Sequence, residues 1–161
     1  MPTPPQPKRG LQPSILDRLT DPESAGTAIL TGYTVEKMYA AVLRDLENLL
    51  NTVHTARDIP AEFLEVRDSL VAYGLPDLAS MEAISSEQRA NIGKTIRTAI
   101  ERFEPRLRRV RVTLLKQDDE VRMSLKFRID ARLAVDPAPD VAFDTILEVG
   151  TGKYLVTPAA A

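Results

Sequence analysis

Two stretches of the chain repeat their apolar side chains every three or four residues, which is the period of an amphipathic helix. The first covers residues 35–53 and follows Thr34, whose hydroxyl suits an N-cap. The second begins at residue 85 or 86, where Ser85 and Gln88 have capping-box spacing, and it ends at Pro105. Both stretches are long enough to predict helices that bury one face.

A further helix is predicted between Pro60 and Tyr73. Its spacing favours burial of three side chains, Phe63, Val66 and Leu70. Gly74 can take the left-handed position just past its end, and Pro76 cannot continue a helix. We therefore interpret residues 73–77, Tyr-Gly-Leu-Pro-Asp, as a helix stop.

After Pro105 the apolar period changes from 3.6 to 2, which is typical of strands. Val110, Val112 and Leu114 alternate with polar residues, and a second strand is predicted over residues 121–130. Residues 141–149 and 153–157 predict two more strands, joined at Gly150-Thr-Gly152. Because helices come first and strands second, the fold class is α+β, with N-terminal helices packed on a C-terminal antiparallel sheet of three to four strands.

The N-terminal region differs from the rest of the chain. Residues 1–12 are rich in proline, which favours an extended tail. Ser14 can cap a short helix that places Ile15, Leu16 and Leu19 on one face, too short to be stable without packing on something. We therefore divide the chain into a tail with a docking helix, residues 1–30, and a single domain, residues 31–161. The three aliphatic side chains are predicted to contact a partner protein.

The composition is that of a folded globular protein, with 43% hydrophobic and 27% charged residues. There is no cysteine, so neither a disulfide nor a thiolate metal site can form. The sequence has no signal-peptide core and no run of 18 apolar residues. We expect a cytoplasmic protein that does not insert into membranes.

The sequence offers few candidates for catalysis. His54 is the only histidine, and we interpret it as a solvated helix-end residue. Residues 150–153, Gly-Thr-Gly-Lys, lack the spacing of a phosphate loop and precede a strand, so they predict a hairpin turn. The chain has 23 acidic residues but no tryptophan, and no pair of carboxyl groups stands out as a glycosidase site. We predict no enzyme, with no catalytic, cofactor-binding or metal-binding residues.

The switch from helix to strand at Phe103-Glu-Pro-Arg-Leu107 is the most distinctive local feature. Pro105 disfavours helical geometry at Glu104 and stiffens the corner between that acid and Arg106. An acid in the last helical turn opposes the helix dipole, and broken local rules often mark function. Two readings are open. The two side chains are aimed at a partner, or they bond within the chain, either as an ion pair or with Arg106 donating to the last helix carbonyls.

Arg109, Arg111, Arg122, Lys126 and Arg128 are predicted to share one face of the sheet. Such a basic face raises the alternative of a nucleic-acid-binding or regulatory adaptor. However, it lacks the interleaved aromatic side chains that stack on bases. We therefore expect no nucleic acid among the partners.

Five segments in this order carry a resemblance to a known family: residues 13–19 (PSILDRL), 45–51 (DLENLLN), 73–77 (YGLPD), 103–107 (FEPRL) and 141–145 (VAFDT). Together they resemble the TssE family of type VI secretion baseplate subunits and the related baseplate wedge proteins of contractile-tailed phages. The Glu-Pro-Arg tripeptide between helix and strand is the signature of that family.

The resemblance implies a structural protein without a cofactor that links the baseplate wedge to the contractile sheath and helps initiate sheath assembly. It implies TssF, TssG and TssK as baseplate partners and TssB and TssC as sheath partners. It also implies that Glu104, Pro105 and Arg106 contact the wedge.

The last strand is expected to lie at a sheet edge, near the end of the chain, with unpaired backbone groups. The resemblance implies that a sheath strand pairs with it. We predict that Leu155 or Val156, whichever directs its N–H outward, takes part in that pairing.

Overall fold

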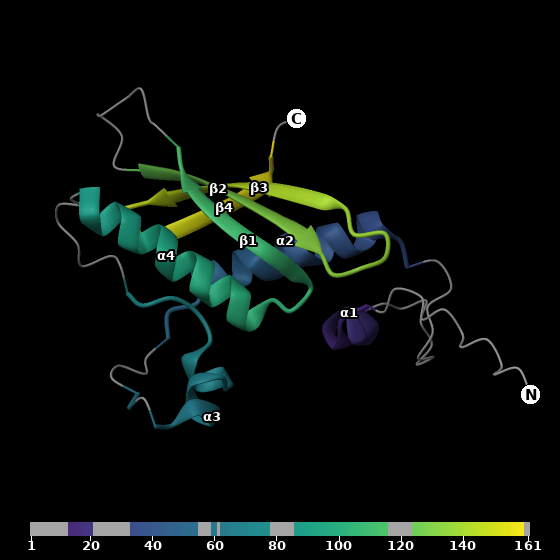
Figure 1. Cartoon of the computed structure of the whole chain (residues 1–161), viewed down its shortest axis with the longest axis horizontal. Helices are drawn as coiled ribbons and strands as arrows, with labels where there is room; N and C mark the ends of the chain where they lie inside the picture. The colour runs from purple at the N-terminus through teal and green to yellow at the C-terminus, as the bar shows by residue number, and fades with distance from the viewer. Residues whose placement is uncertain are drawn as a thin grey trace, which may run out of the picture. The chain divides into compact units, whose positions relative to one another are not determined.

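The computed structural model describes residues 13–20, 33–54, 59–60, 62–77, 86–115 and 124–159. Its helices are α1 (Ile15–Thr20), α2 (Val35–Asn51), α3 (Leu64–Arg67), the 3-10 helix η2 (Leu70–Ala72) and α4 (Ser86–Phe103). Its strands are β1 (Leu107–Leu114), β2 (Ser124–Leu133), β3 (Asp140–Glu148) and β4 (Lys153–Pro158) (Figure 1). Helices followed by an antiparallel sheet confirm the α+β class.

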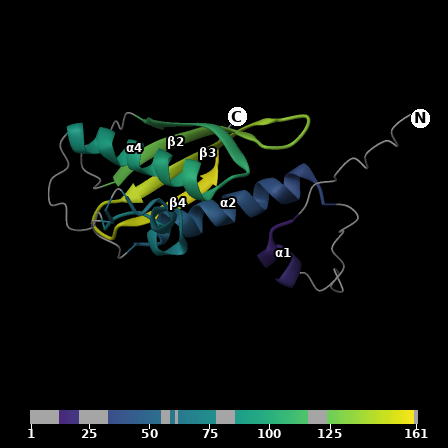
Figure 2. The ribbon, with the colours of Figure 1, turned by 60° about the horizontal axis from the view of Figure 1, so that its bottom comes forward.

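The chain forms two compact units, residues 1–42 and 43–161, with the boundary inside α2. In the second unit the four strands are antiparallel and lie in the order β1-β2-β3-β4. Figure 2 shows α4 running along one face of this sheet. The division into residues 1–30 and 31–161 stays a prediction.

The core of the second unit lies between the sheet and the helices. Alternate residues of β2 are buried, from Leu125 to Leu133, as the period of 2 predicts. On α4 the buried residues follow helical spacing: Ile92, Ile96, Ala99 and Ile100. Gly93 faces the sheet, where a Cβ would lie at an ordinary van der Waals distance of 3.8 Å from the ring of Phe127. The helical and strand periods in the sequence are therefore both confirmed.

The ends of the two long helices agree in part with the sequence. The backbone N–H of Lys37 donates to Thr34 Oγ1 over 3.3 Å, which confirms Thr34 as the N-cap of α2. That helix stops at Asn51, so Val53 lies outside it and is exposed. The capping box predicted at Ser85 lies outside the described residues. Pro105 follows the end of α4 as predicted.

The prediction of a helix from Pro60 to Tyr73 is wrong. Among its described residues, 60 and 62–73, the segment holds only the four-residue α3 and the three-residue η2. Its three apolar side chains expected in the core, Phe63, Val66 and Leu70, are exposed. The break lies at Ser69, whose hydroxyl donates to the carbonyl of Val66 over 2.7 Å and accepts the N–H of Val71 over 3.3 Å. A side chain that bonds its own backbone in this way competes with helix propagation.

Gly74 follows the end of η2 with the positive φ predicted for it, and it also allows two backbone segments to approach closely. Its φ is +113°, and a Cβ there would lie 2.3 Å from the carbonyl oxygen of Thr52. This close approach lets Leu75 donate its N–H to that carbonyl over 2.8 Å, while the backbone N–H of His54 donates to the carbonyl of Leu75 over 3.0 Å. Val53 and Leu75 thus form a parallel bridge that ties residues 73–77 to the end of α2.

The strand predictions hold with shifted ends. β2 continues to Leu133, and the turn that precedes it, with Arg122, lies outside the described residues. A bulge interrupts β1 between Arg108 and Arg111, with Arg109 in a left-handed conformation at φ 55°. The N–H of Gly152 donates to the carbonyl of Glu148 over 2.8 Å, so residues 150–153 form the predicted hairpin turn.

Helix α1 is short and capped as predicted. Ser14 Oγ accepts the backbone N–H of Asp17 over 3.1 Å, and its hydroxyl donates back to the Asp17 carboxylate over 2.8 Å. Ile15, Leu16 and Leu19 are 74%, 50% and 79% exposed. In the part of the chain that the structure describes, no helix is long and apolar enough to span a membrane.

Candidate functional site

The corner between α4 and β1 is built around a buried carboxylate. The N–H of Glu104 still donates to the carbonyl of Ile100 over 2.9 Å, and the carbonyl of Glu104 accepts the N–H of Leu107 over 3.1 Å. Pro105 sits exposed at the tip of the turn. Because the chain reverses within three residues, the Glu104 side chain points inward, and the residue is only 4% exposed.

Arg106 holds that carboxylate with three N–H donors. Its backbone N–H and its Nε donate to Glu104 Oε1 over 3.1 and 2.7 Å, and its Nη2 donates to Glu104 Oε2 over 2.5 Å. The same Nη2 donates to Asp45 Oδ2 over 2.6 Å. Asp45 lies on α2, so one guanidinium ties the end of α4 to a helix far away in the sequence. Charge-assisted, forked contacts of this kind are among the strongest polar contacts in proteins.

The charges in this cluster balance. Asp45 also accepts the Nε and Nη2 of Arg44 over 3.0 and 2.9 Å, so two arginines face two acids. The hydrogen bonds to Glu104 raise the pKa of Arg106; burial opposes that rise, and Asp45 adds to it. Arg106 Nη1 is buried without a hydrogen-bond partner in the described part of the chain.

Tyr73 joins this cluster from a third segment. Its ring packs edge-on against Phe103 with centroids 5.3 Å apart. Burial raises the pKa of its hydroxyl, and the negative charges of Asp45 and Glu104 raise it further. Three of the segments that carry the family resemblance, 45–51, 73–77 and 103–107, therefore meet at one corner. Asp45 and Tyr73 both stand in these motifs, but no local pattern in the sequence predicts their contact with the corner.

Of the two readings left open for the corner, the ion pair within the chain is present. The Glu104 carboxylate is turned into the protein rather than toward a partner, whereas Pro105 is exposed and the Arg106 side chain is 22% exposed. Contact of this tripeptide with a wedge protein stays a prediction. If it occurs, the surface that a partner meets consists of Pro105 and the outer part of Arg106.

Some backbone groups on the outer edge of strand β4 already have a hydrogen-bond partner. The Asn51 side chain accepts the backbone N–H of Tyr154 over 2.9 Å and donates to its carbonyl over 2.8 Å. Backbone groups alternate in direction along an antiparallel strand, so Leu155 faces β3 while Val156 directs its N–H to the open edge. Figure 2 shows β4 next to β3. The choice left open between Leu155 and Val156 therefore falls on Val156, and its contact with a partner stays a prediction.

The sheet face predicted to be basic carries acids as well. Arg128 pairs with Asp144 over 3.3 Å and Arg132 pairs with Asp140 over 2.5 Å, both across neighbouring strands. Arg111 stands opposite Asp130 in the register of β1 and β2. Cross-strand pairing thus neutralises much of this face, which weakens the alternative of nucleic-acid binding.

His54 lies just past the end of α2. This is the helix-end position predicted for it; the residue is half-buried, and its Nδ1 is buried without a hydrogen-bond partner among the described residues. Within the described ranges, no group of three or more His, Asp or Glu residues is placed to hold a metal ion.

Comparison with known proteins gives one family. A family model described as "Baseplate wedge protein gp25" matches residues 36–138, which is more than half of the chain and includes the whole corner cluster. A chain of the solved structure "The baseplate complex from the type VI secretion system" is similar at 18% sequence identity, with a TM-score of 0.47, over 69% of this chain and 94% of that chain. The comparison with curated proteins gives no significant match.

Proposed function

The chain belongs to the family of the baseplate wedge protein gp25, and from this membership we propose that it is a structural subunit of a type VI secretion baseplate. In this proposal it joins the wedge to the contractile sheath and helps to initiate sheath assembly. Its partners are TssF, TssG and TssK in the baseplate and TssB and TssC in the sheath. It acts in the cytoplasm and without catalysis.

The observation that carries the proposal is the corner cluster, which lies inside the family match. Its acids are held by arginine N–H groups and are not directed into a cleft, an arrangement suited to rigidity rather than to proton transfer. The cluster joins α2, the 73–77 segment and the α4–β1 turn into one unit. A rigid corner of this kind suits a subunit that transmits force between two assemblies.

Attachment to the wedge is assigned to two surfaces. The first is the corner tip, which consists of Pro105 and the partly exposed Arg106. The buried Glu104 carboxylate holds the Arg106 side chain in place by hydrogen bonds. The second is the face of α1 that carries Ile15, Leu16 and Leu19, whose exposure supports a partner contact.

Attachment to the sheath is assigned to the edge of β4. An added strand would bond to backbone groups from Val156 onward, because Asn51 already occupies those of Tyr154. Pro158 has no N–H, so the open stretch is short. A short open edge favours pairing with one specific strand of a partner and limits pairing between copies of this chain.

Purification of the tagged chain from cells that carry the secretion system tests the proposal. We expect TssF and TssG to be retained at near-equal levels by wild type and by Lys126→Glu, a change on the outer sheet face. We expect weaker retention by Arg106→Lys, because an ammonium cannot reproduce the forked contact. Recovery of the folded chain without any baseplate or sheath subunit would refute the proposal, as would muramidase activity in a zymogram.

A further inference from the structure

The segment that failed to form a long helix exposes a patch of large apolar side chains. We define this apolar patch by Phe63, Leu64, Val66, Leu70 and Val71, of which Leu70 is 86% exposed and Leu64 is 64% exposed. Burial of apolar side chains is the main favourable contribution to folding and association, so five left exposed within nine residues are available for contact with another protein. Large apolar side chains exposed together on one segment are typical of interaction sites.

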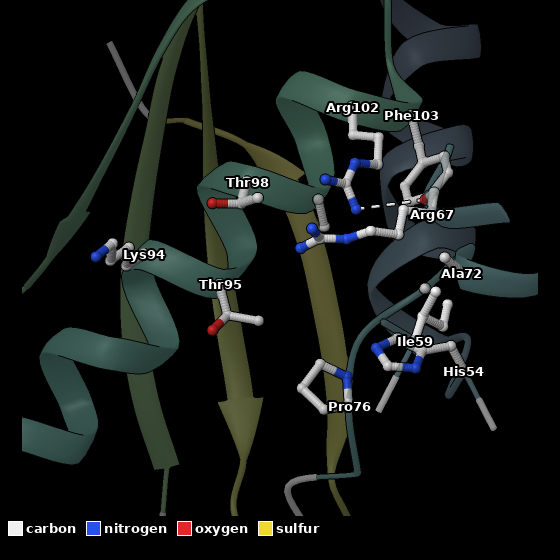
Figure 3. Close-up of a pocket in the computed structure, with 12 residues that line it drawn as sticks. His54, Ile59, Arg67, Ala72, Pro76, Lys94, Thr95, Thr98, Arg102 and Phe103 are labelled. Atoms are coloured by element: carbon white, nitrogen blue, oxygen red, sulfur yellow. Dashed lines mark hydrogen bonds between the residues drawn. The ribbon is translucent and has the colours of Figure 1, made fainter. Parts of the chain in front are cut away.

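The patch is held in place by a polar anchor rather than by a core of its own. Arg102 of α4 pairs with Asp68 over 3.2 Å, and its Nη1 donates to the carbonyl of Arg67 over 3.4 Å. Figure 3 shows this second contact, with the side chains of Arg102 and Arg67 close together. The apolar side chains are therefore presented on a segment that is fixed to α4.

A basic groove adjoins the patch. It has a volume of about 440 Å³ and is lined by His54, Arg67, Lys94 and Arg102 together with the hydroxyls of Thr95 and Thr98. Figure 3 shows Lys94, Thr95 and Thr98 along α4, with His54 across the groove from them. Arg67 belongs to the segment that carries the patch and also lines the groove, so the patch and the groove are neighbours along the chain at this residue.

The charge of the groove is not neutralised by the described residues. Asp68 forms an ion pair with Arg102, whereas Arg67 and Lys94 form no ion pair within the described ranges. The groove thus offers two free cations beside apolar surface, which together suit a ligand with carboxylates next to apolar side chains.

We propose that the basic groove and the apolar patch together bind an acidic, apolar segment of a neighbouring baseplate protein. Carboxylates of that segment pair with Arg67 and Lys94, and its apolar side chains cover Leu64 and Leu70. A nucleic acid fits less well, because the patch offers only Phe63 for stacking on bases. The inference rests on the proposed function for the source of the partner and adds a surface separate from the corner tip, α1 and the β4 edge.

Photo-crosslinking in the purified baseplate tests this proposal. The full chain carries Leu70→p-benzoylphenylalanine, and a second version carries the same crosslinker at Thr113 on the outer sheet face as the control. We expect position 70 to attach to one segment of another polypeptide that contains Asp or Glu beside apolar residues, and position 113 not to attach to it. Adding Arg67→Glu and Lys94→Glu should lower the yield at position 70 by about tenfold or more, because like charges then face each other. Lys126→Glu should leave the yield unchanged.

Two results separate the inference from the proposed function. In the first, wedge proteins are retained but position 70 gives no protein crosslink, or it attaches to nucleic acid or to a segment without carboxylates. A crosslink yield that does not respond to the charge reversals counts in the same way. Each of these results refutes the inference and leaves the proposed function standing. If no baseplate subunit is retained, the proposed function fails, and the inference is then judged by whether position 70 still attaches to an acidic segment of any polypeptide.

Discussion

Removal of the Arg106 guanidinium should harm stability chiefly by leaving Glu104 buried and unpaired. The Glu104 side chain is 5% exposed, and Arg106 supplies both of its charged donors. Loss of one partner of a buried pair costs about 3–5 kcal/mol. Arg106 is itself 22% exposed and water can reach part of the site, so we expect Arg106→Ala to lower the free energy of unfolding by about 3 kcal/mol.

A second substitution should then recover part of that loss. Glu104→Gln in the Arg106→Ala background replaces an unpaired carboxylate by a neutral amide, whose oxygen can still accept the backbone N–H of residue 106. We expect it to regain about 1–2 kcal/mol. Arg44→Ala serves as the control, because its exposed pair with Asp45 is worth at most about 1 kcal/mol.

Urea unfolding followed by circular dichroism gives the four free energies. A double variant less stable than Arg106→Ala would refute this reasoning, because the cost would then lie in lost packing rather than in an uncompensated charge.

Three further changes follow from the structure. Gly74→Ala places a Cβ 2.3 Å from the carbonyl of Thr52 at φ +113°, so unfolding free energy should fall by about 2 kcal/mol or more, and a fall below 0.5 kcal/mol would contradict the close approach. Asn51→Ala removes two hydrogen bonds to Tyr154 and should cost about 1–3 kcal/mol while speeding amide exchange at Tyr154; unchanged exchange would show that the side chain does not close this edge. Deletion of residues 1–20 should weaken retention of TssF and TssG with little change in melting temperature, whereas a large drop in melting temperature would place α1 in the core.

The long elements could be predicted from the sequence because each carries its period locally. The helices α2 and α4 and the alternating strand β2 bury the side chains that their spacing indicates. The helix predicted over residues 60–73 is wrong, because three apolar residues at helical spacing do not show whether their side chains can pack against a core. Ser69 is a sequence feature that argues against a long helix, since its hydroxyl can hydrogen-bond to the neighbouring backbone.

Only the contacts of the candidate site between residues close in the sequence could be predicted. Glu104 and Arg106 are two residues apart, so their pairing was one of two readings of the sequence. Arg106 and Asp45 are 61 residues apart, and Asn51 and Tyr154 are 103 apart. Contacts across such separations depend on how the helices pack on the sheet. No local pattern marks them.

Live imaging of a fluorescent sheath tests the central claim most directly. In cells that lack this chain we expect no extended sheaths, and we expect wild type to restore them. Val156→Pro should fold and join the wedge but fail to restore sheaths, because proline removes the N–H that faces the open edge of β4. Leu155→Ala should restore them, since its backbone groups face β3 and remain intact. Normal sheaths without the chain would contradict its role as a sheath-initiating baseplate subunit, and normal sheaths with a wedge-bound Val156→Pro variant would contradict the assigned edge.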